Sequence, residues 1–519
     1  MKRKLPRITP TPPGAPAVAM WVPLLVLAAS PAGIAAQAEA GAGAATITAA
    51  DLRLRIGALA HDSMRGRATP SPELDQAARH IARRFEEFGL QPADGDSYLQ
   101  EYPLTASRAG SPERQLLEID GPGGGAIDVS EILSVPGGRG EAAGPLAIVT
   151  PGGVDPPSGA VAVMPIAPED TRRGLEAVRG ILDGGAVAVL LAVDAPDDYF
   201  DSIRRFYERE RLSVGMPEEL GAPVALVRTH ALPETLRAAL ASGAAATAWE
   251  ATVRTHSEFR EERAYNTIGW IEGSDPDLRG EFIVFTAHMD HVGVGRPVDG
   301  DSIYNGADDD ASGTAAIMEL AQAFASLETP PRRSLVFMTV SGEERGLLGS
   351  GWYAENPLFP LGATVANLNI DMIGRNWRDT VVAIGADEST LGATLRRTLR
   401  EHPELGLEVI DDPWPEENFY FRSDHYSFAR KGVPILFFFT GTHEDYHGPN
   451  DEPDRILYEK TARITRLIFH LGQRIADANE RPEWDPAAYR RVVEGVGRGS
   501  SSPQESRSPR RSPRAPAGE

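Results

Sequence analysis

The chain has 519 residues, a formal net charge of −22 at pH 7 and no cysteine. The missing cysteine excludes disulfides, thiolate metal ligands, a cysteine nucleophile and a lipid-modified cysteine anchor. The acidic balance argues against a nucleic-acid partner, because such proteins present a basic surface. Any metal must be held by histidines and carboxylates, which zinc accepts as ligands.

The N-terminus has the three parts of an export signal. A basic start at 2–7 is followed by an apolar run at 17–30 and by small residues at 34–38. We expect residues 1–36 to be a signal peptide and the protein to be exported, either periplasmic or secreted. The apolar run is shorter than the about 20 residues of a membrane helix, so no stable membrane insertion is expected after signal removal. The alternative is an uncleaved anchor that includes the following alanines.

The first strong helical pattern covers about 72–88. Ser71 suits the cap and Gly89 suits the end of this helix. Apolar residues recur at helical spacing, at Leu74, Ala78, Ile81, Phe85 and Phe88. We therefore expect the helix to pack against a core.

The pattern changes between about 120 and 257. Short apolar runs alternate with turns, and one helical segment appears near 171–183. This region predicts a small, separate, β-rich domain. Its two histidines, His230 and His256, have no partner cluster nearby, so we interpret the domain as non-catalytic.

From about 265 the chain alternates between apolar strands and helices. The strand-like runs are 281–288, 334–341, 363–374 and 433–441, and the helical runs are 314–327, 389–402 and 461–478. Continuous apolar strands between helices predict a sheet covered on both faces. The fold class is therefore α/β, a three-layer sandwich around a central, mostly parallel mixed sheet. Ligands of such sheets bind beyond the carboxyl ends of the strands.

The first of these strands ends in a histidine cluster. His288 is a candidate metal ligand, and Asp290 lies two residues on, on the same face of an extended segment. The Asp290 carboxylate can accept the other ring N–H of His288, which is the usual support for a ligating histidine. Alternatively, His288 and His291 are a pair of surface histidines.

Acidic residues follow the next elements. Three adjacent aspartates, Asp308, Asp309 and Asp310, precede a predicted helix. They could merely favour the helix dipole, but three carboxylates in a row repel one another, and a bound cation relieves that cost.

The later strands end in further acidic residues and a histidine. Glu343 and Glu344 follow the third strand; one can bind a metal while the other accepts a proton from water. A solvated turn is the alternative. Asp371 lies in an apolar run, where an unpaired carboxylate is costly. His447 lies in an acidic loop, 443–451, after the most apolar strand.

These clusters resemble the motifs of a known family. The runs FTAHMDHVG, YNGADDDASGTAA, SGEERGLLGS, NLNIDMIGR, RSDHYSF and DYHGPNDEPDRI resemble, in order and spacing, those of the M28 zinc aminopeptidases, which include bacterial leucyl aminopeptidases and glutamate carboxypeptidases. The resemblance is strong over 262–475 and extends to 50–103. The middle region resembles a divergent protease-associated (PA) domain.

The resemblance implies the zinc aminopeptidase fold with two zinc ions per chain. His288 and Asp371 would hold one zinc, Glu344 and His447 would hold the other, and Asp309 would bridge both.

The same resemblance implies three further roles. Glu343 would be the general base, Asp290 would support His288, and Tyr446 would stabilise the oxyanion of the tetrahedral intermediate.

The implied activity is that of an exported aminopeptidase, which hydrolyses N-terminal residues from peptide substrates with metal-activated water. Three alternatives remain. A carboxypeptidase or dipeptidase of the same family would need cations for a terminal carboxylate, for which Arg375 and Arg422 are candidates. A glutaminyl cyclase would use one zinc. A binding protein would have kept the fold without catalysis. The sequence assigns neither a side-chain preference nor an oligomeric state.

The expected organisation has five parts. They are a signal peptide at 1–36, the N-terminal part of the catalytic domain at 45–119, a PA-like insert at 120–257, the main M28 catalytic domain at 258–485 and a disordered tail at 497–519.

Overall fold

The structure is a computed structural model that describes residues 41–150, 156–216, 219–243 and 248–495. The expected signal peptide and C-terminal tail lie outside these described residues. Within the described ranges, no helix combines the length and the apolar character that crossing a membrane requires.

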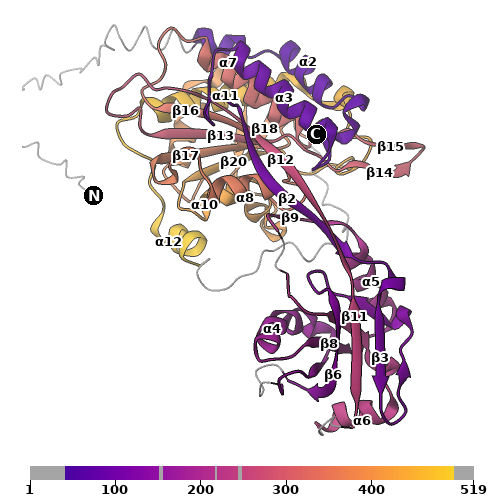
Figure 1. The fold of residues 1–519 in the computed structure, drawn as a ribbon. Helices are drawn as coiled ribbons and strands as arrows, with labels where there is room; N and C mark the ends of the chain where they lie inside the picture. Colours follow the sequence, from indigo (N-terminus) through magenta and orange to yellow (C-terminus); the bar gives the residue numbers. More distant parts are fainter. Residues whose placement is uncertain (1–40, 151–155, 217–218, 244–247, 496–519) are drawn as a thin grey trace, which may run out of the picture.

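A ten-stranded sheet forms the main domain, and its four central strands are parallel (Figure 1). In spatial order these strands are β20 (Ile435–Phe439), β17 (Thr364–Ile370), β13 (Phe282–His288) and β16 (Ser334–Val340). Every residue of β16 and β17 is buried, as expected for strands covered on both faces. The four apolar runs predicted as strands are thus confirmed.

Further strands extend the sheet on both sides through mainly antiparallel pairings, so the sheet is mixed. They are β12 (Ser257–Ile271), β2 (Leu99–Ala109), β9 (Arg211–Val214) and β1 (Gln91–Pro92) beyond β16, and β18 (Thr380–Ile384) and β19 (Glu408–Ile410) beyond β20.

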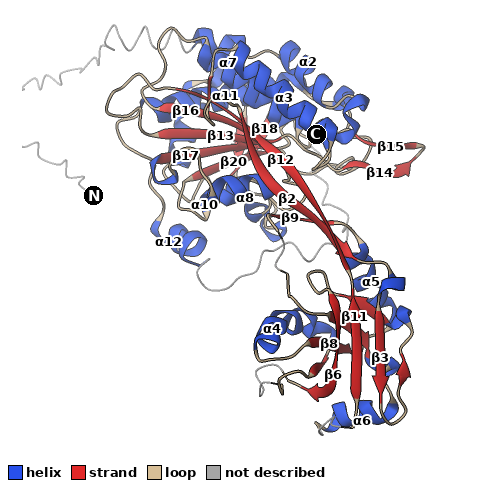
Figure 2. Ribbon diagram, in the orientation of Figure 1, coloured by secondary structure: helices blue, strands red, loops and turns tan. Residues whose placement is uncertain are grey.

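Helices cover both faces of this sheet (Figure 2). One face carries α2 (Ala49–Leu59), α3 (Pro72–Glu87), α7 (Ala311–Ala325), α9 (Leu391–Glu401) and α11 (Tyr458–Asp477). The other face carries α8 (Leu348–Glu355), α10 (His425–Ala429) and, near the end of the described chain, α12 (Pro486–Tyr489). The α/β three-layer sandwich expected from the sequence is therefore confirmed.

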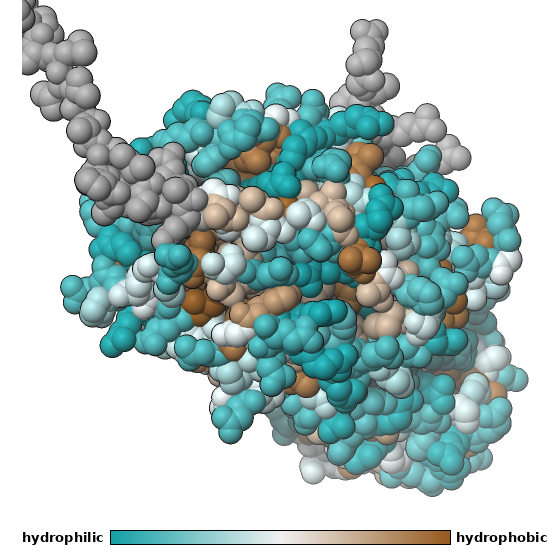
Figure 3. All heavy atoms as spheres, turned by 90° about the horizontal axis from the view of Figure 1, so that it is seen from above, coloured by the Kyte–Doolittle hydropathy of each residue, from teal (hydrophilic) through white to brown (hydrophobic). Residues whose placement is uncertain are grey.

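Helix α3 shows how the sequence determines one of these elements. The Ser71 hydroxyl accepts a hydrogen bond from the Leu74 amide at 3.0 Å, and Pro72 occupies the first turn. Ile81 and Phe85 are fully buried, which stabilises the fold by roughly 1.5–3 kcal/mol for each side chain. The outward face of this helical layer is mainly hydrophilic (Figure 3), as expected for amphipathic helices on a surface.

A second, eight-stranded sheet forms the inserted domain. Its order is β4 (Gly125–Ala126), β3 (Leu116–Asp120), β11 (Glu250–Thr255), β6 (Gly140–Ile148), β7 (Val161–Ile166), β8 (Ala188–Val193), β10 (Val224–Arg228) and β5 (Ile132–Ser134). Its helices are α4 (Thr171–Asp183), α5 (Asp197–Glu208) and α6 (Glu234–Ser242). The predicted helical segment is α4. The sequence did not indicate α5 and α6; α5, for example, buries only Phe200 and Tyr207 among charged residues.

The insert is connected through two adjacent antiparallel strands. Strands β2 and β12 pair continuously from Leu99–Thr267 to Ala109–Ser257. Strand β3 already lies in the second sheet, so the insert starts closer to residue 110 than to the expected 120. The likeness of this insert to a PA domain stays a prediction.

Candidate metal centre and catalytic site

The predicted site residues meet at the carboxyl edge of the parallel strands. His288 is the last residue of β13, Glu344 follows β16, and Asp371 follows β17 directly. Asp309 comes two residues before α7 begins. Because parallel strands end at one edge of the sheet, residues far apart in the sequence become neighbours there.

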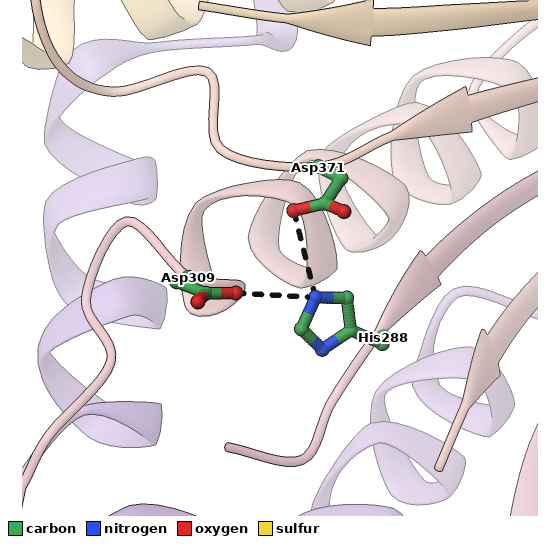
Figure 4. A group of neighbouring side chains, drawn as sticks. All are labelled: His288, Asp309 and Asp371. Atoms are coloured by element: carbon green, nitrogen blue, oxygen red, sulfur yellow. Dashed lines mark ion pairs between the residues drawn. The ribbon is translucent and has the colours of Figure 1, made fainter. Parts of the chain in front are cut away.

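Asp309 presents one carboxylate oxygen to each of two histidines. Its Oδ1 lies 3.2 Å from His288 Nε2, and its Oδ2 lies 3.1 Å from His447 Nε2. The same two nitrogens face further carboxylates: His288 Nε2 is 3.5 Å from Asp371 Oδ1, and His447 Nε2 is 3.1 Å from Glu344 Oε2. Figure 4 shows Asp309 and Asp371 pointing toward the His288 ring. The structure thus brings all five predicted ligands together.

Several buried acceptors in this cluster lack hydrogen bonds. Asp309 Oδ2, Asp371 Oδ1 and Glu344 Oε1 accept none of acceptable geometry from the described residues. Buried carboxylate oxygens without donors are costly, and a divalent cation is the partner that such oxygens and imidazole nitrogens prefer. The residues therefore fit a metal, and zinc in particular.

Mutual attraction fixes the charge states of the ligands. Burial lowers the pKa of His447, but the Glu344 and Asp309 carboxylates outweigh this and raise it to about 11. Burial likewise opposes the rise of the His288 pKa, which Asp371 and Asp309 hold well above its usual value. Protons therefore occupy these nitrogens in the metal-free chain, and a metal must displace them.

Asp310, next to the predicted bridge, has a structural role. Its carboxylate accepts three backbone amides: His288 at 3.2 Å, Gly313 at 2.8 Å and Met372 at 3.1 Å. One side chain thus joins the end of β13, the start of α7 and the loop after β17. This explains why Asp309, and not Asp310, faces the histidines.

Asp308 also points away from the ligand cluster. Its Oδ1 accepts the Gly374 amide at 2.5 Å. The Asp451 carboxylate in turn accepts the amides of Asp308 and Asp309 at 3.0 Å. The three adjacent aspartates therefore have different partners.

Asp290 supports His288 through its backbone carbonyl and not, as expected, through its carboxylate. The His288 Nδ1–H donates to the backbone carbonyl of Asp290 at 3.2 Å, whereas the nearer carboxylate oxygen is 3.8 Å away. This bond leaves Nε2 free to face the acidic ligands. The Asp290 carboxylate instead accepts the Thr69 hydroxyl at 2.8 Å and the Glu343 amide at 3.3 Å. It therefore positions the loop that carries the predicted base.

Glu343, the predicted base, has a high proton affinity. Burial is the main cause that raises the pKa of its carboxyl well above the usual value, and nearby carboxylates including Glu344 add to it while His288 opposes it. A carboxyl with a raised pKa can accept a proton and release it again near neutral pH.

Tyr446 lies against the outermost ligand. Its ring stacks on the His447 ring with centroids 3.9 Å apart. Burial, followed by the charges of Asp309 and Glu344, holds the pKa of its phenol well above the usual value. The phenol therefore keeps its proton and remains a hydrogen-bond donor.

Three further residues belong to the site, although no role was predicted for them from the sequence. The His291 Nδ1 lies 2.9 Å from Glu344 Oε1, so His291, Asp309 and Glu344 form a second possible ligand group. The Ser423 hydroxyl donates to Asp371 Oδ2 at 2.7 Å. The adjacent Asp424 is fully buried, and burial raises its pKa to about 7. All three lie within the FTAHMDHVG and RSDHYSF runs, which were the only available signal.

The fold and the site define a class of protein: an α/β domain that collects oxygen and nitrogen ligands for divalent metals at the ends of parallel strands. Residues 266–472 match the model of Peptidase family M28. Over these residues, the resemblance to the M28 peptidases drawn from the sequence is therefore confirmed.

Individual proteins show the same likeness. Aminopeptidase YwaD of Bacillus subtilis strain 168 is 26% identical over 244 residues, which are 45% of this chain and 49% of that protein. Leupeptin-inactivating enzyme 1 of Streptomyces exfoliatus is 30% identical over 178 residues, 34% of this chain and 36% of that protein. The chain thus spans about half or less of these curated relatives. An aminopeptidase structure from Aneurinibacillus sp. strain AM-1 aligns with a TM-score of 0.48 and 21% identity, over 85% of this chain and 97% of that one.

A buried lysine lies beside the site. Lys460 is 1% exposed and donates to the backbone carbonyl of Arg375. Burial, with added repulsion from Arg375 and Arg463, lowers its pKa from 10.5 to about 7, while Asp308 opposes the shift.

We predict that this lysine makes the protein more stable as pH rises from about 7. Between the folded pKa of about 7 and the ordinary value of 10.5, the unfolded chain binds more protons than the folded one. This group therefore adds at most about 1.4 kcal/mol of stability per pH unit. Denaturant unfolding of the metal-free wild type and K460M at pH 7, 8 and 9 measures the effect. The difference wild type minus K460M should increase with pH; a constant difference would contradict the assignment.

Proposed function

We propose that the protein is an exported di-zinc aminopeptidase that hydrolyses N-terminal residues from peptides. The observation that carries the proposal is the placement of Asp309 between two histidine nitrogens, with one carboxylate oxygen for each. A carboxylate placed in this way is suited to bridge two cations, as in two-metal hydrolytic sites.

The ligand set divides into two halves. His288 and Asp371 would hold one zinc, Glu344 and His447 would hold the other, and Asp309 would serve both. We assign the second nitrogen to His447 because its Nε2 lies 3.1 Å from both Asp309 and Glu344. His291 lies farther from Asp309, at 3.7 Å, and would support Glu344.

When bound, zinc supplies Lewis-acid chemistry that polarises a carbonyl and makes water more acidic. The residues of the chain would transfer the proton, stabilise the developing negative charge and position the base. Glu343 accepts a proton from the attacking water and returns it to the leaving amine. Tyr446 donates a hydrogen bond to the oxygen on which negative charge develops. Asp290 holds the Glu343 amide, which keeps the base next to the ligands.

The charges around the site favour the amino end of a peptide. The Arg375 guanidinium is 2.7 Å from the Asp445 carboxylate, so a terminal carboxylate would have to compete for it. Arg422 contacts the Glu417 carboxylate at 3.4 Å and stacks over Phe419. Both arginines that could bind a terminal carboxylate are therefore already paired within the chain, which favours recognition of the amino end.

A substrate panel tests which end of the peptide is recognised. We expect free aminoacyl chromogenic substrates to be cleaved, N-acetylated versions to resist cleavage, and a zinc chelator to abolish turnover until zinc is restored. Metal content is measured on the same sample, and two zinc ions per chain are expected. Cleavage of the acetylated substrates at a similar rate would contradict the aminopeptidase assignment. One zinc with cyclisation of N-terminal glutamine would favour a glutaminyl cyclase.

A matched pair of substitutions tests the division between Glu343 and Glu344. We expect E343Q to keep both zinc ions and to lose about 10²–10⁴-fold in kcat, because only a proton acceptor is removed. The neighbouring E344Q should lose one zinc as well as activity, because a ligand is removed. Zinc analysis and steady-state kinetics measure both effects. Near-normal activity of E343Q would rule out its role as base.

A further inference from the structure

A tight turn from the N-terminal part of the chain reaches the metal centre. It spans Asp62–Arg67 and ends in three consecutive residues with left-handed backbone, at φ values of 45° for Arg65, 67° for Gly66 and 48° for Arg67. A Cβ at Gly66 would lie 2.6 Å from the Gly293 carbonyl oxygen, so only glycine fits. Left-handed arginines are uncommon, and they persist where surrounding contacts hold them.

The side chain at the end of this turn makes those contacts. The Arg67 guanidinium is completely buried. It donates to the carbonyls of Leu59 at 2.6 Å, Met289 at 2.8 Å, Asn305 at 2.8 Å and Gly306 at 3.0 Å. Met289 follows the ligand His288, and residues 305 and 306 lie in the loop that leads to Asp309. One side chain therefore joins both ligand-bearing loops.

The positive charge of Arg67 is buried without a directly paired carboxylate in the described part of the chain. Among the described residues, no carboxylate forms an ion pair with it within 4.0 Å. Its charge nevertheless acts on Asp290, Asp309, Asp310 and Asp451, while burial lowers its own pKa only to about 10. At neutral pH it is therefore a fixed positive charge, placed behind the acidic residues without neutralising any one of them.

We propose that Arg67 is a positioning residue of the metal centre, which sets the spacing between the His288 loop and the Asp309 loop and stabilises the acidic ligand set. The proposal rests on the metal binding proposed above. It gives a function to a segment outside 266–472. Arginine suits this role because its planar fork reaches several carbonyls at once, whereas a lysine amine is a single point donor.

Zinc titration of two variants tests the proposal. R67K keeps the charge but cannot reach all four carbonyls, and R67M loses both charge and bonds. We expect zinc affinity, measured by competition with a fluorescent chelator, to fall tenfold or more in R67K and further in R67M, as is typical when the support of a metal ligand is lost. The pH profile of zinc affinity should also shift upward in R67M, because the acidic ligands lose a positive neighbour.

Arg333 provides a matched control. It is also buried, donates to the backbone carbonyls of Ile475 and Ala478, and lies at the opposite end of β16 from the site. R333K should lower the Tm of the metal-free protein without changing zinc affinity. If R67M does not fold, R67K still tests the proposal, because it keeps the charge and most of the side-chain volume and is therefore expected to fold.

The outcomes separate this proposal from the proposed function. Zinc affinity of R67K and R67M within twofold of wild type, or a loss no greater than that in R333K, would overturn the role of Arg67. If the wild type itself binds no zinc, the proposed function fails together with the role built on it.

Discussion

The structure depends on the concentration of negative charge around Asp309. The carboxylates that lie buried or nearly so near one edge of the sheet include those of Asp290, Asp309, Asp310, Glu344, Asp371 and Asp424. Burying an unpaired carboxylate costs several kcal/mol even after relaxation, so such a cluster persists only if cations and amides compensate it. Asp310 obtains three backbone amides, and Asp309 obtains two histidines. The oxygens that remain without donors are the ones that would hold the proposed metal ions.

The fold meets this constraint by bringing distant segments to one edge. His288 and Asp371 lie at the ends of the parallel strands β13 and β17, and Asp309 lies just before α7. The N-terminal segment adds two residues that hold the loops of the site. Thr69 bonds to Asp290 and to the Gly342 amide, and Arg67 donates to the Met289 carbonyl. The catalytic domain is therefore assembled from both sides of the insert, with β2 and β12 as the connection.

Much of this arrangement could be predicted from the sequence, and what could not has physical reasons. Apolar runs predicted the central strands, and strand ends predicted where the site lies. Local chemistry could not divide Asp309 from its neighbours, because their roles depend on amides supplied by other elements. Arg67 left no pattern at all, since its partners are backbone carbonyls that are invisible in a sequence. The expected support of His288 by the Asp290 carboxylate differs from the structure because the backbone carbonyl lies closer.

Diffraction from zinc-loaded crystals, recorded above and below the zinc absorption edge, tests the central claim most directly. The account predicts two anomalous peaks about 3.5–4 Å apart. One should lie between His288 and Asp371 and the other between Glu344 and His447, with one Asp309 oxygen toward each. A single peak, or two peaks without Asp309 between them, would contradict it.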